Sequence, residues 1–354
     1  MPPLLQFTLR RFAYAVASLI LITMVLYAGF MLTPPEARAM LYVPKGRGAE
    51  RVGENFIQRI IQEKHLDDPY LVQYFYWARD LARGSWGYSP TLNEDVLAAL
   101  LRRTPATLEL AFYSLLLLVP LGLASGLIAG WHPRRWFDRS FRSLAFLGTA
   151  IPPFILSLVL LAIFYVRLGW FAPSRSDLAL EVEISKGTFH AFTGILTLDS
   201  LLNGRLDAFA STLRHLALPV VTLALYHWAV LGRITRSSVA GERHKEHVVA
   251  ARARGVREPQ LMRRHTFRAV LGPSLTLAGL AAAALVTGIF VVEIIYDING
   301  VSRVIVSAMS FEPDPPAALG FTVYSVIMVL GLMFVLDVAL AVFDPRIRDE
   351  IFSP

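Results

Sequence analysis

The chain has 354 residues, of which 55% are hydrophobic and 17% charged, and its mean hydropathy is +0.51. Soluble domains carry about 25% charged residues, so this composition argues against a purely water-soluble protein. The absence of cysteine excludes disulfides, thiolate metal sites and a cysteine nucleophile, whereas the net charge of +7 leaves nucleic acid or an anionic membrane surface open as a partner.

Six stretches lack Asp, Glu, Lys and Arg over a length that can cross about 30 Å of hydrocarbon as a helix. They cover residues 12–35, 110–131, 143–166, 215–232, 269–292 and 315–336. Backbone groups in hydrocarbon must bond to one another, so we predict an all-α, polytopic membrane protein with six transmembrane helices. The first apolar stretch is too long for a signal peptide, so residues 1–33 are expected to form a retained N-terminal tail and span.

Lys and Arg are concentrated in segments that a six-span bundle places on one side of the membrane. These segments are residues 1–11, 131–143, 233–268 and 344–354, the last a short C-terminal tail. Positively charged loops stay in the cytoplasm, so both termini are expected there. The basic charge is therefore mainly a topology signal, and no nucleic acid partner is expected.

The loop at residues 34–103 lies outside in this topology and is expected to fold as short helices. Asp68 can cap a helix that has Pro69 in its first turn, is rich in aromatic residues and stops near Gly84. Thr104 and Pro105 are expected to begin the second span. This extracytoplasmic loop either shields the bundle or forms a docking platform for an external partner, and the two roles are compatible.

The third span contains Ile151-Pro152-Pro153, so it must kink there or start late. The next external loop covers residues 167–214. Its stretch 187–204 is partly apolar but carries His190 and Asp199, so we expect loop structure rather than a seventh span.

The cytoplasmic loop at residues 233–268 predicts a helix, a sharp turn and a second helix. Its alanines favour a helix, Gly255 can adopt a positive φ that ends it, and Pro259 can open the next helix. A surface of small residues flanked by Arg252 and Arg254 suits close packing into a cleft of a cytoplasmic partner. The alternative from physics alone is a basic loop on the anionic leaflet.

Several motifs in this order are similar to one family. They are Leu9-Arg10-Arg11, Asp67-Asp68-Pro69, the run 84–89, the run 106–110, Arg233-x-x-Arg236-Ser237-Ser238, Ala250-Ala251-x-x-x-Gly255, His265 with Arg268, Pro273, the run 293–296 and the run 344–348. Nearly end to end, they resemble the first permease subunit of dipeptide and oligopeptide ABC importers. The stretch around Gly255 resembles the family's EAA loop.

The chain departs from the family pattern at four places. Val249 stands where the loop often begins with Glu, and Ala269 stands where Asn is usual. The turns at 298–301 and 33–36 also differ. These two turns are expected on the outer face, so they bear on the substrate and the docking partner more than on ATP coupling.

The resemblance implies a type I importer permease fold in a bacterial or archaeal inner (plasma) membrane, with a five-helix core at residues 104–343. It implies a second homologous permease subunit, two cytoplasmic ATPase subunits that bind ATP and Mg²⁺, an extracytoplasmic solute-binding protein and a peptide substrate. It also implies an ATPase-coupling loop made of Glu246, Ala250, Ala251, Arg252, Ala253, Arg254 and Gly255.

This chain lacks a G-x-x-x-x-G-K-[ST] phosphate loop, so it is expected to bind no nucleotide and to be a transport subunit rather than an enzyme. We expect no catalytic residue, cofactor or metal site. His244 and His247 are expected on a solvated face rather than at a metal.

Three acidic residues, Glu109, Glu293 and Asp337, lie in or at the ends of spans, where charge is costly and often functional. Glu109 and Glu293 are expected near the outer end. They either meet the ammonium group of a peptide or bond to backbone or to an arginine of the partner permease. Asp337 is expected deeper, in a polar contact.

Two alternatives remain at this point. Within the importer class, nickel or an oligosaccharide could replace the peptide as cargo. In a different class, the three carboxylates could serve a proton-coupled secondary carrier, although we see no inverted repeat of the kind that such carriers often show.

Overall fold

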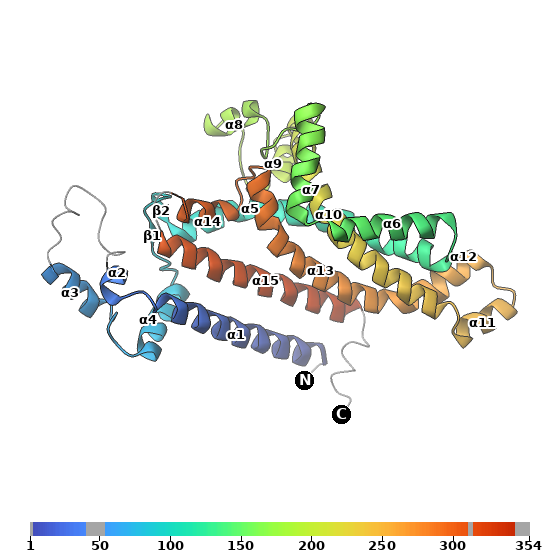
Figure 1. The fold of residues 1–354 in the computed structure, drawn as a ribbon, viewed down its shortest axis with the longest axis horizontal. Helices are drawn as coiled ribbons and strands as arrows, with labels where there is room; N and C mark the ends of the chain where they lie inside the picture. Colours follow the sequence, from blue (N-terminus) through green and yellow to red (C-terminus); the bar gives the residue numbers. More distant parts are fainter. Residues whose placement is uncertain (1–2, 40–53, 311–313, 344–354) are drawn as a thin grey trace. The chain divides into compact units, whose positions relative to one another are not determined.

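The computed structural model describes residues 3–39, 54–310 and 314–343. Within these residues the chain is helical apart from two short strands and the connecting turns, which confirms the predicted all-α fold class (Figure 1). The predicted tail at 344–354 lies outside the described residues. The predicted limits 1–33, 34–103 and 104–343 stay predictions.

The chain divides into two compact units, which we describe one at a time. Unit 1 comprises residues 1–8, 104–300 and 332–354, and unit 2 comprises residues 9–103 and 301–331. Three long helices run from one unit into the other: α1 (Pro3–Phe30), α5 (Val96–Trp131) and α15 (Pro315–Phe343).

Unit 2 contains the predicted outer loop, which does fold as short helices. Its remaining elements are α2 (Pro35–Ala39), α3 (Glu54–Glu63), α4 (Tyr70–Ala82), β1 (Tyr88–Ser89), β2 (Glu94–Asp95) and α14 (Ser302–Ala308). Gln73 of α4 joins these pieces, because its Oε1 accepts a hydrogen bond from Arg38 Nη1 at 2.7 Å and its Nε2 donates to Leu66 O at 2.9 Å. Tyr27 of α1 stacks on Trp77 of α4 with ring centroids 4.9 Å apart.

Helix α4 lies where a helix was predicted and ends as predicted, but Pro69 does not lie in its first turn and Asp68 does not cap it. Pro69 is the N-cap residue, without a side-chain hydrogen bond to the helix. The Asp68 carboxylate instead lies 2.8 Å from His65 Nδ1. After the helix, Gly84 and Gly87 both have positive φ, and the antiparallel pair β1–β2 follows, which the sequence did not predict.

Unit 1 contains most of the long apolar helices. Its other elements are α6 (Trp136–Ala150), α7 (Pro153–Leu160), η3 (a π-helix, Leu161–Arg167), α8 (Leu178–Ser185), α9 (Leu196–Leu202), α10 (Leu206–Glu242), α11 (Glu246–Ala253), α12 (Glu258–Gln260), η4 (a π-helix, Leu261–Phe267) and α13 (Arg268–Ile295).

Five helices of the described residues are long and apolar enough to span a membrane, and a sixth span results if the bent pair α6 and α7–η3 counts as one. The bend at Ile151-Pro152 is 101°, which confirms the predicted break. The stretch 187–204 forms no span, also as predicted: it contains only the short helix α9.

Two helices extend beyond the limits that were predicted for their spans. Pro105 does not begin a helix but lies inside α5, together with Pro120. Helix α10 likewise extends beyond the predicted span at both ends, so residues 233–242 of the predicted cytoplasmic loop are helical. Charged residues mark the membrane boundary but do not end a helix, and membrane helices tolerate proline where neighbouring groups satisfy the freed carbonyl.

Candidate functional site

The predicted helix–turn–helix is present in unit 1, at the far end of α10 from α8 and α9 (Figure 1). Helix α11 covers Glu246–Ala253, and its first-turn glutamate suits the positive end of the helix dipole. Gly255 follows with φ of +84°, which an L side chain rarely adopts, and ends the helix as predicted. Pro259 lies in the first turn of α12, also as predicted.

Helix α11 rests on unit 1 through one apolar face. Val248 and Ala251 are fully buried. They lie in a cluster with four residues of other elements: Trp131 at the end of α5, Val239 of α10, Leu261 of η4 and Val270 of α13. Ala251 therefore faces its own bundle and is not available for close approach by a partner, contrary to the sequence expectation. The other side of the helix is exposed: Glu246, His247, Val249, Ala250, Arg252 and Ala253.

One of the two predicted rim arginines is already engaged within the loop. Arg252 Nε lies 2.7 Å from Glu258 Oε1, so an ion pair braces α11 against α12. The Arg252 guanidinium lowers the pKa of the Glu258 carboxyl, and the same pairing raises the pKa of Arg252. Arg254 is exposed and has no acidic partner among the described residues, so it is the arginine free to meet a partner.

The end of α5 is tied to the same region. Arg243, just after α10, donates from Nη1 to Trp131 O at 2.8 Å and so satisfies a carbonyl at the helix terminus. The neighbouring His132 has a lowered pKa, because burial and then the positive charges of Arg135 and Arg243 disfavour its charged form.

A buried ion pair joins α6 to α10 near the end of α10 that leads to α11. Asp138, in the first turn of α6, is fully buried and accepts hydrogen bonds from Arg236 Nε and from Arg236 Nη2, the latter at 3.0 Å. The backbone N–H of Arg134 donates to the same carboxylate at 2.8 Å. Asp138 was missed from the sequence, although its signal was present: it is the one acidic residue in the basic segment 131–143.

Two glycines of α5, Gly126 and Gly130, lie against the backbone of α10, and Gly122 lies against the side chain of Leu231. Gly122, Gly126 and Gly130 follow one face of α5 at four-residue spacing. A Cβ on Gly126 would lie 2.6 Å from Gly232 O, and a Cβ on Gly130 would lie 2.6 Å from Arg236 O. Only glycine fits this approach, which is a common way for membrane helices to pack. The spacing was visible in the sequence but was not used.

Glu109 lies at the opposite end of unit 1, fully buried and fully engaged. It accepts hydrogen bonds from Arg175 Nε at 3.1 Å and Nη2 at 2.6 Å, and from the N–H and Oγ1 of Thr197, both at 2.7 Å. The arginine therefore comes from the same chain and not from a partner permease. With four donors in place, this carboxylate holds the loop that carries α9 rather than presenting an open site for an ammonium group.

Glu293 and Asp337 lie in different environments. Glu293 is fully buried near the end of α13, where Thr107 Oγ1 donates to its Oε1. Its carboxylate also packs on Gly300, because a Cβ there would lie only 2.1 Å from Oε1. Asp337 is half-buried in α15. Glu109 and Glu293 thus serve internal contacts in this structure.

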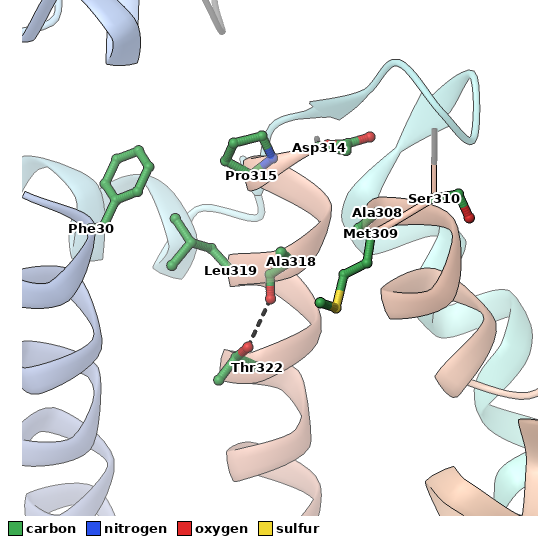
Figure 2. Close-up of a pocket in the computed structure, with 9 residues that line it drawn as sticks. All are labelled: Phe30, Ala308, Met309, Ser310, Asp314, Pro315, Ala318, Leu319 and Thr322. Atoms are coloured by element: carbon green, nitrogen blue, oxygen red, sulfur yellow. Dashed lines mark hydrogen bonds between the residues drawn. The ribbon is translucent and has the colours of Figure 1, made fainter. Parts of the chain in front are cut away.

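A cavity of about 510 Å³ in unit 2 lies between the end of α1, the end of α14 and the start of α15 (Figure 2). Phe30, Met309 and Leu319 give it an apolar lining. Its one acidic residue, Asp314, already accepts hydrogen bonds from Ser89 and Thr91, and Thr322 donates to Ala318 O. The cavity therefore offers no open pair of charges for the termini of a peptide.

A second cavity of about 380 Å³ in unit 1 is more polar and is lined in part by Asp177, Ser211, Arg214 and His215. No group of three or more potential metal ligands occurs among the described residues. Near α11, Lys245 Nζ lies 2.6 Å from the carboxylate of Glu242 and forms an ion pair with it, and His247 Nε2 lies 3.5 Å from the same carboxylate.

Comparisons with known proteins agree with this architecture. The family described as "Binding-protein-dependent transport system inner membrane component" matches residues 122–349, more than half of the chain. The di/tripeptide transport system permease protein DppB of Pseudomonas aeruginosa is 29% identical over 98% of this chain and 100% of its own length.

Two further relatives carry similar names. The probable D,D-dipeptide transport system permease protein DdpB of Escherichia coli is 31% identical over 84% of this chain and 86% of its own. The oligopeptide transport system permease protein AppB of Bacillus subtilis is 27% identical over 97% and 99%, respectively. The chain belongs to the family of inner-membrane components of binding-protein-dependent transport systems.

Proposed function

We propose that this chain is the permease subunit of an ATP-driven importer of di- or oligopeptides and that α11 is its ATPase-coupling helix. A binding-protein-dependent system works with a solute-binding protein and an ATPase, and the ATP and Mg²⁺ are held by the ATPase subunits. The observation that carries the proposal is how α11 packs. Its Val248 and Ala251 contact the ends of the long helices, and its other face is exposed.

The exposed face is the one that meets the ATPase. Val249, Ala250 and Ala253 present short apolar side chains, and Arg254 supplies a free positive charge at the edge. Small side chains permit close approach, and a free arginine suits a carboxylate at the rim of a cleft. Arg252 contributes differently, because its bond to Glu258 keeps α11 and α12 at a fixed angle.

Motion of α11 reaches the bundle through three kinds of contact. The first is the apolar contact of α11 with Trp131 at the end of α5. The second is the contact of the α5 glycines with α10, and the third is the Asp138–Arg236 ion pair, which connects the start of α6 to α10. These contacts join elements that are distant in sequence but adjacent to the coupling segment. A displacement imposed on α11 therefore moves the inner ends of α5, α6 and α10 as a unit.

The peptide cargo rests on the three relatives described above, which are named for peptide transport. We further propose that a second, similar permease completes the pathway, that two ATPase subunits dock on the cytoplasmic side and that both termini lie there. Glu109 and Glu293 act in this scheme as structural anchors of the outer end, since their carboxylates are occupied by groups of the same chain.

The test is ATP hydrolysis and peptide uptake by the assembled transporter in liposomes, with a defined mixture of di- and tripeptides and the candidate binding protein. Gly255→Pro fixes φ near −65° and so removes the turn, whereas Gly255→Asn can keep the left-handed conformation. We expect the intact chain and Gly255→Asn to show hydrolysis that rises with peptide. Gly255→Pro should lose this rise while the ATPase subunits still co-purify.

Two outcomes would contradict the proposal in different ways. Peptide uptake that a proton gradient drives without any ATPase would reject the importer and favour a secondary carrier. Hydrolysis that depends on the binding protein and on Gly255 but not on peptide would keep the coupling role and reject the cargo.

A further inference from the structure

Helix α9 has the opposite amphipathic pattern from a helix on a water-exposed surface. Its buried side carries three polar residues, Thr197, Asp199 and Ser200, next to Leu196. Its exposed side carries leucines: Leu198 is 41% exposed, Leu201 47% and Leu202 56%. The next helix, α10, begins with Leu206, which is 70% exposed.

The buried polar groups are satisfied inside the protein. Asp199 accepts hydrogen bonds from the backbone N–H groups of Thr193 and Gly194 at 2.8 and 2.9 Å. Thr197 donates to Glu109, and Ser200 Oγ donates to Leu196 O at 2.7 Å. The polar side chains of α9 therefore have hydrogen-bond partners inside the protein. The leucine side chains on its exposed side cannot form hydrogen bonds.

The hydrogen bonds from Thr197 to Glu109 fix how deep α9 lies in the membrane. Trp131 is followed by His132, Arg134 and Arg135, which mark the inner membrane surface. With about 1.5 Å per residue, α5 rises roughly 33 Å from Trp131 back to Glu109. A hydrocarbon core is about 30 Å thick, so Glu109 and the first turn of α9 lie at its outer boundary.

Charged residues follow the leucines in the chain. Arg205 Nη1 lies 2.8 Å from Glu183 of α8, and Arg205 Nη2 lies 2.6 Å from Asp207. An apolar face with polar residues at its edge is typical of a helix that lies in the membrane interface.

We propose that α9 is an interfacial helix whose Leu198, Leu201 and Leu202 contact the acyl chains of the outer leaflet. In this arrangement the internal hydrogen bonds of Glu109 and Asp199 hold the polar side of α9 against the bundle. The lipid covers the leucines that would otherwise face water. The inference concerns how the outer loop is seated and does not depend on the identity of the cargo.

The absence of cysteine in this chain makes a direct test possible. Leu201→Cys and Leu202→Cys are made separately, and each is spin-labelled in the assembled transporter in phospholipid liposomes. Accessibility is measured by power saturation with oxygen, which concentrates in hydrocarbon, and with a water-soluble nickel chelate. Val249→Cys on the exposed face of α11 is the control. It is labelled in the same liposomes but without the ATPase subunits, because these are proposed to cover this face.

We expect both α9 labels to be several-fold more accessible to oxygen than to nickel and the α11 label to show the reverse. Labels on α9 that the nickel chelate reaches readily would place this face in water and overturn the proposal. Labels that neither reagent reaches would also overturn it, because a protein partner, such as the second permease, would then cover the leucines. Two separate positions guard against a label that disturbs one of them.

Discussion

Helices α9 and α11 are both short, both belong to unit 1 and stand at opposite ends of α10, yet their faces are reversed. Helix α11 buries Val248 and Ala251 and exposes charged and small residues. Helix α9 buries Thr197, Asp199 and Ser200 and exposes leucines. One helix is held by apolar contacts and the other by hydrogen bonds to buried carboxylates.

The difference shows that the side of a helix that is buried, apolar or polar, depends on whether the helix is surrounded by water or by lipid. In water, an apolar side chain gains free energy by leaving the surface, so α11 turns its apolar face inward. Next to lipid there is no such gain, and the polar groups must find partners inside the protein. The same rule therefore places opposite faces of two helices against the bundle.

The largest expected effect comes from removing the anchor of α9. Glu109→Gln leaves the partly buried Arg175 without its counter-charge, and breaking such a pair costs about 3 kcal/mol. We expect a clear fall in the temperature of unfolding of the purified chain. The double variant Glu109→Gln with Arg175→Gln should recover part of the loss. A single variant as stable as the unmodified chain would show that α9 is held in another way.

A smaller loss of stability is expected from a substitution at the contact between α5 and α10. Gly126→Ala places a Cβ against the backbone of α10, and overpacking of this kind costs about 1–3 kcal/mol. Gly241→Ala is the control, since no atom lies within 4 Å of its added Cβ, and it should be neutral or slightly stabilising. Thermal unfolding of both variants is compared. Equal effects would argue against a close backbone contact.

A matched pair of substitutions tests the reversed faces directly. Leu202 and Val249 are exposed to similar extents, at 56% and 49%. In a bilayer, Leu202→Asn should lower the free energy of unfolding by about 1 kcal/mol, because it loses apolar contact with lipid. Val249→Asn faces water and should change it by less than about 0.5 kcal/mol. Similar effects at the two positions would remove the distinction between the helices.

The smallest effect concerns the brace between α11 and α12. The pKa of Glu258 is lowered in the folded loop, so the ion pair stabilises the loop above the ordinary glutamate pKa and loses this effect as pH falls through the lowered value. The protection factors of the α11 amides, which are corrected for the intrinsic pH dependence of hydrogen exchange, should therefore fall on acidification in the unmodified chain. In Glu258→Gln these protection factors should be slightly lower at neutral pH, with less additional change from this pair on acidification. An identical pH response in both would exclude the brace.

Much of this fold could be predicted from local sequence signals. The apolar stretches predicted the long helices, and Pro152 predicted the break between α6 and α7. Gly255 and Pro259 predicted the turn after α11. Each depends on a backbone preference that acts within a few residues. The ends of α5 and α10 were missed because a change from lipid to water leaves the helical backbone unchanged.

The contacts that hold the site together were harder to predict. Glu109 and Arg175 are far apart in the chain, as are Asp138 and Arg236, and a single sequence offers no signal that pairs them. The inward face of α11 was predictable in principle, because Val248 and Ala251 are three residues apart and share one side of a helix. The three alanines of α11 also suit a surface for close approach by a partner, so the composition of the helix did not indicate which side is buried.

The glycine face of α5 has a mechanical consequence. Side chains are the compliant layer between most packed helices, because they can change rotamer and absorb small movements. Where Gly126 and Gly130 touch the backbone of α10, that layer is missing. Along this stretch, α5 and α10 cannot shift against each other by a change of rotamer, so a displacement of one backbone is passed directly to the other.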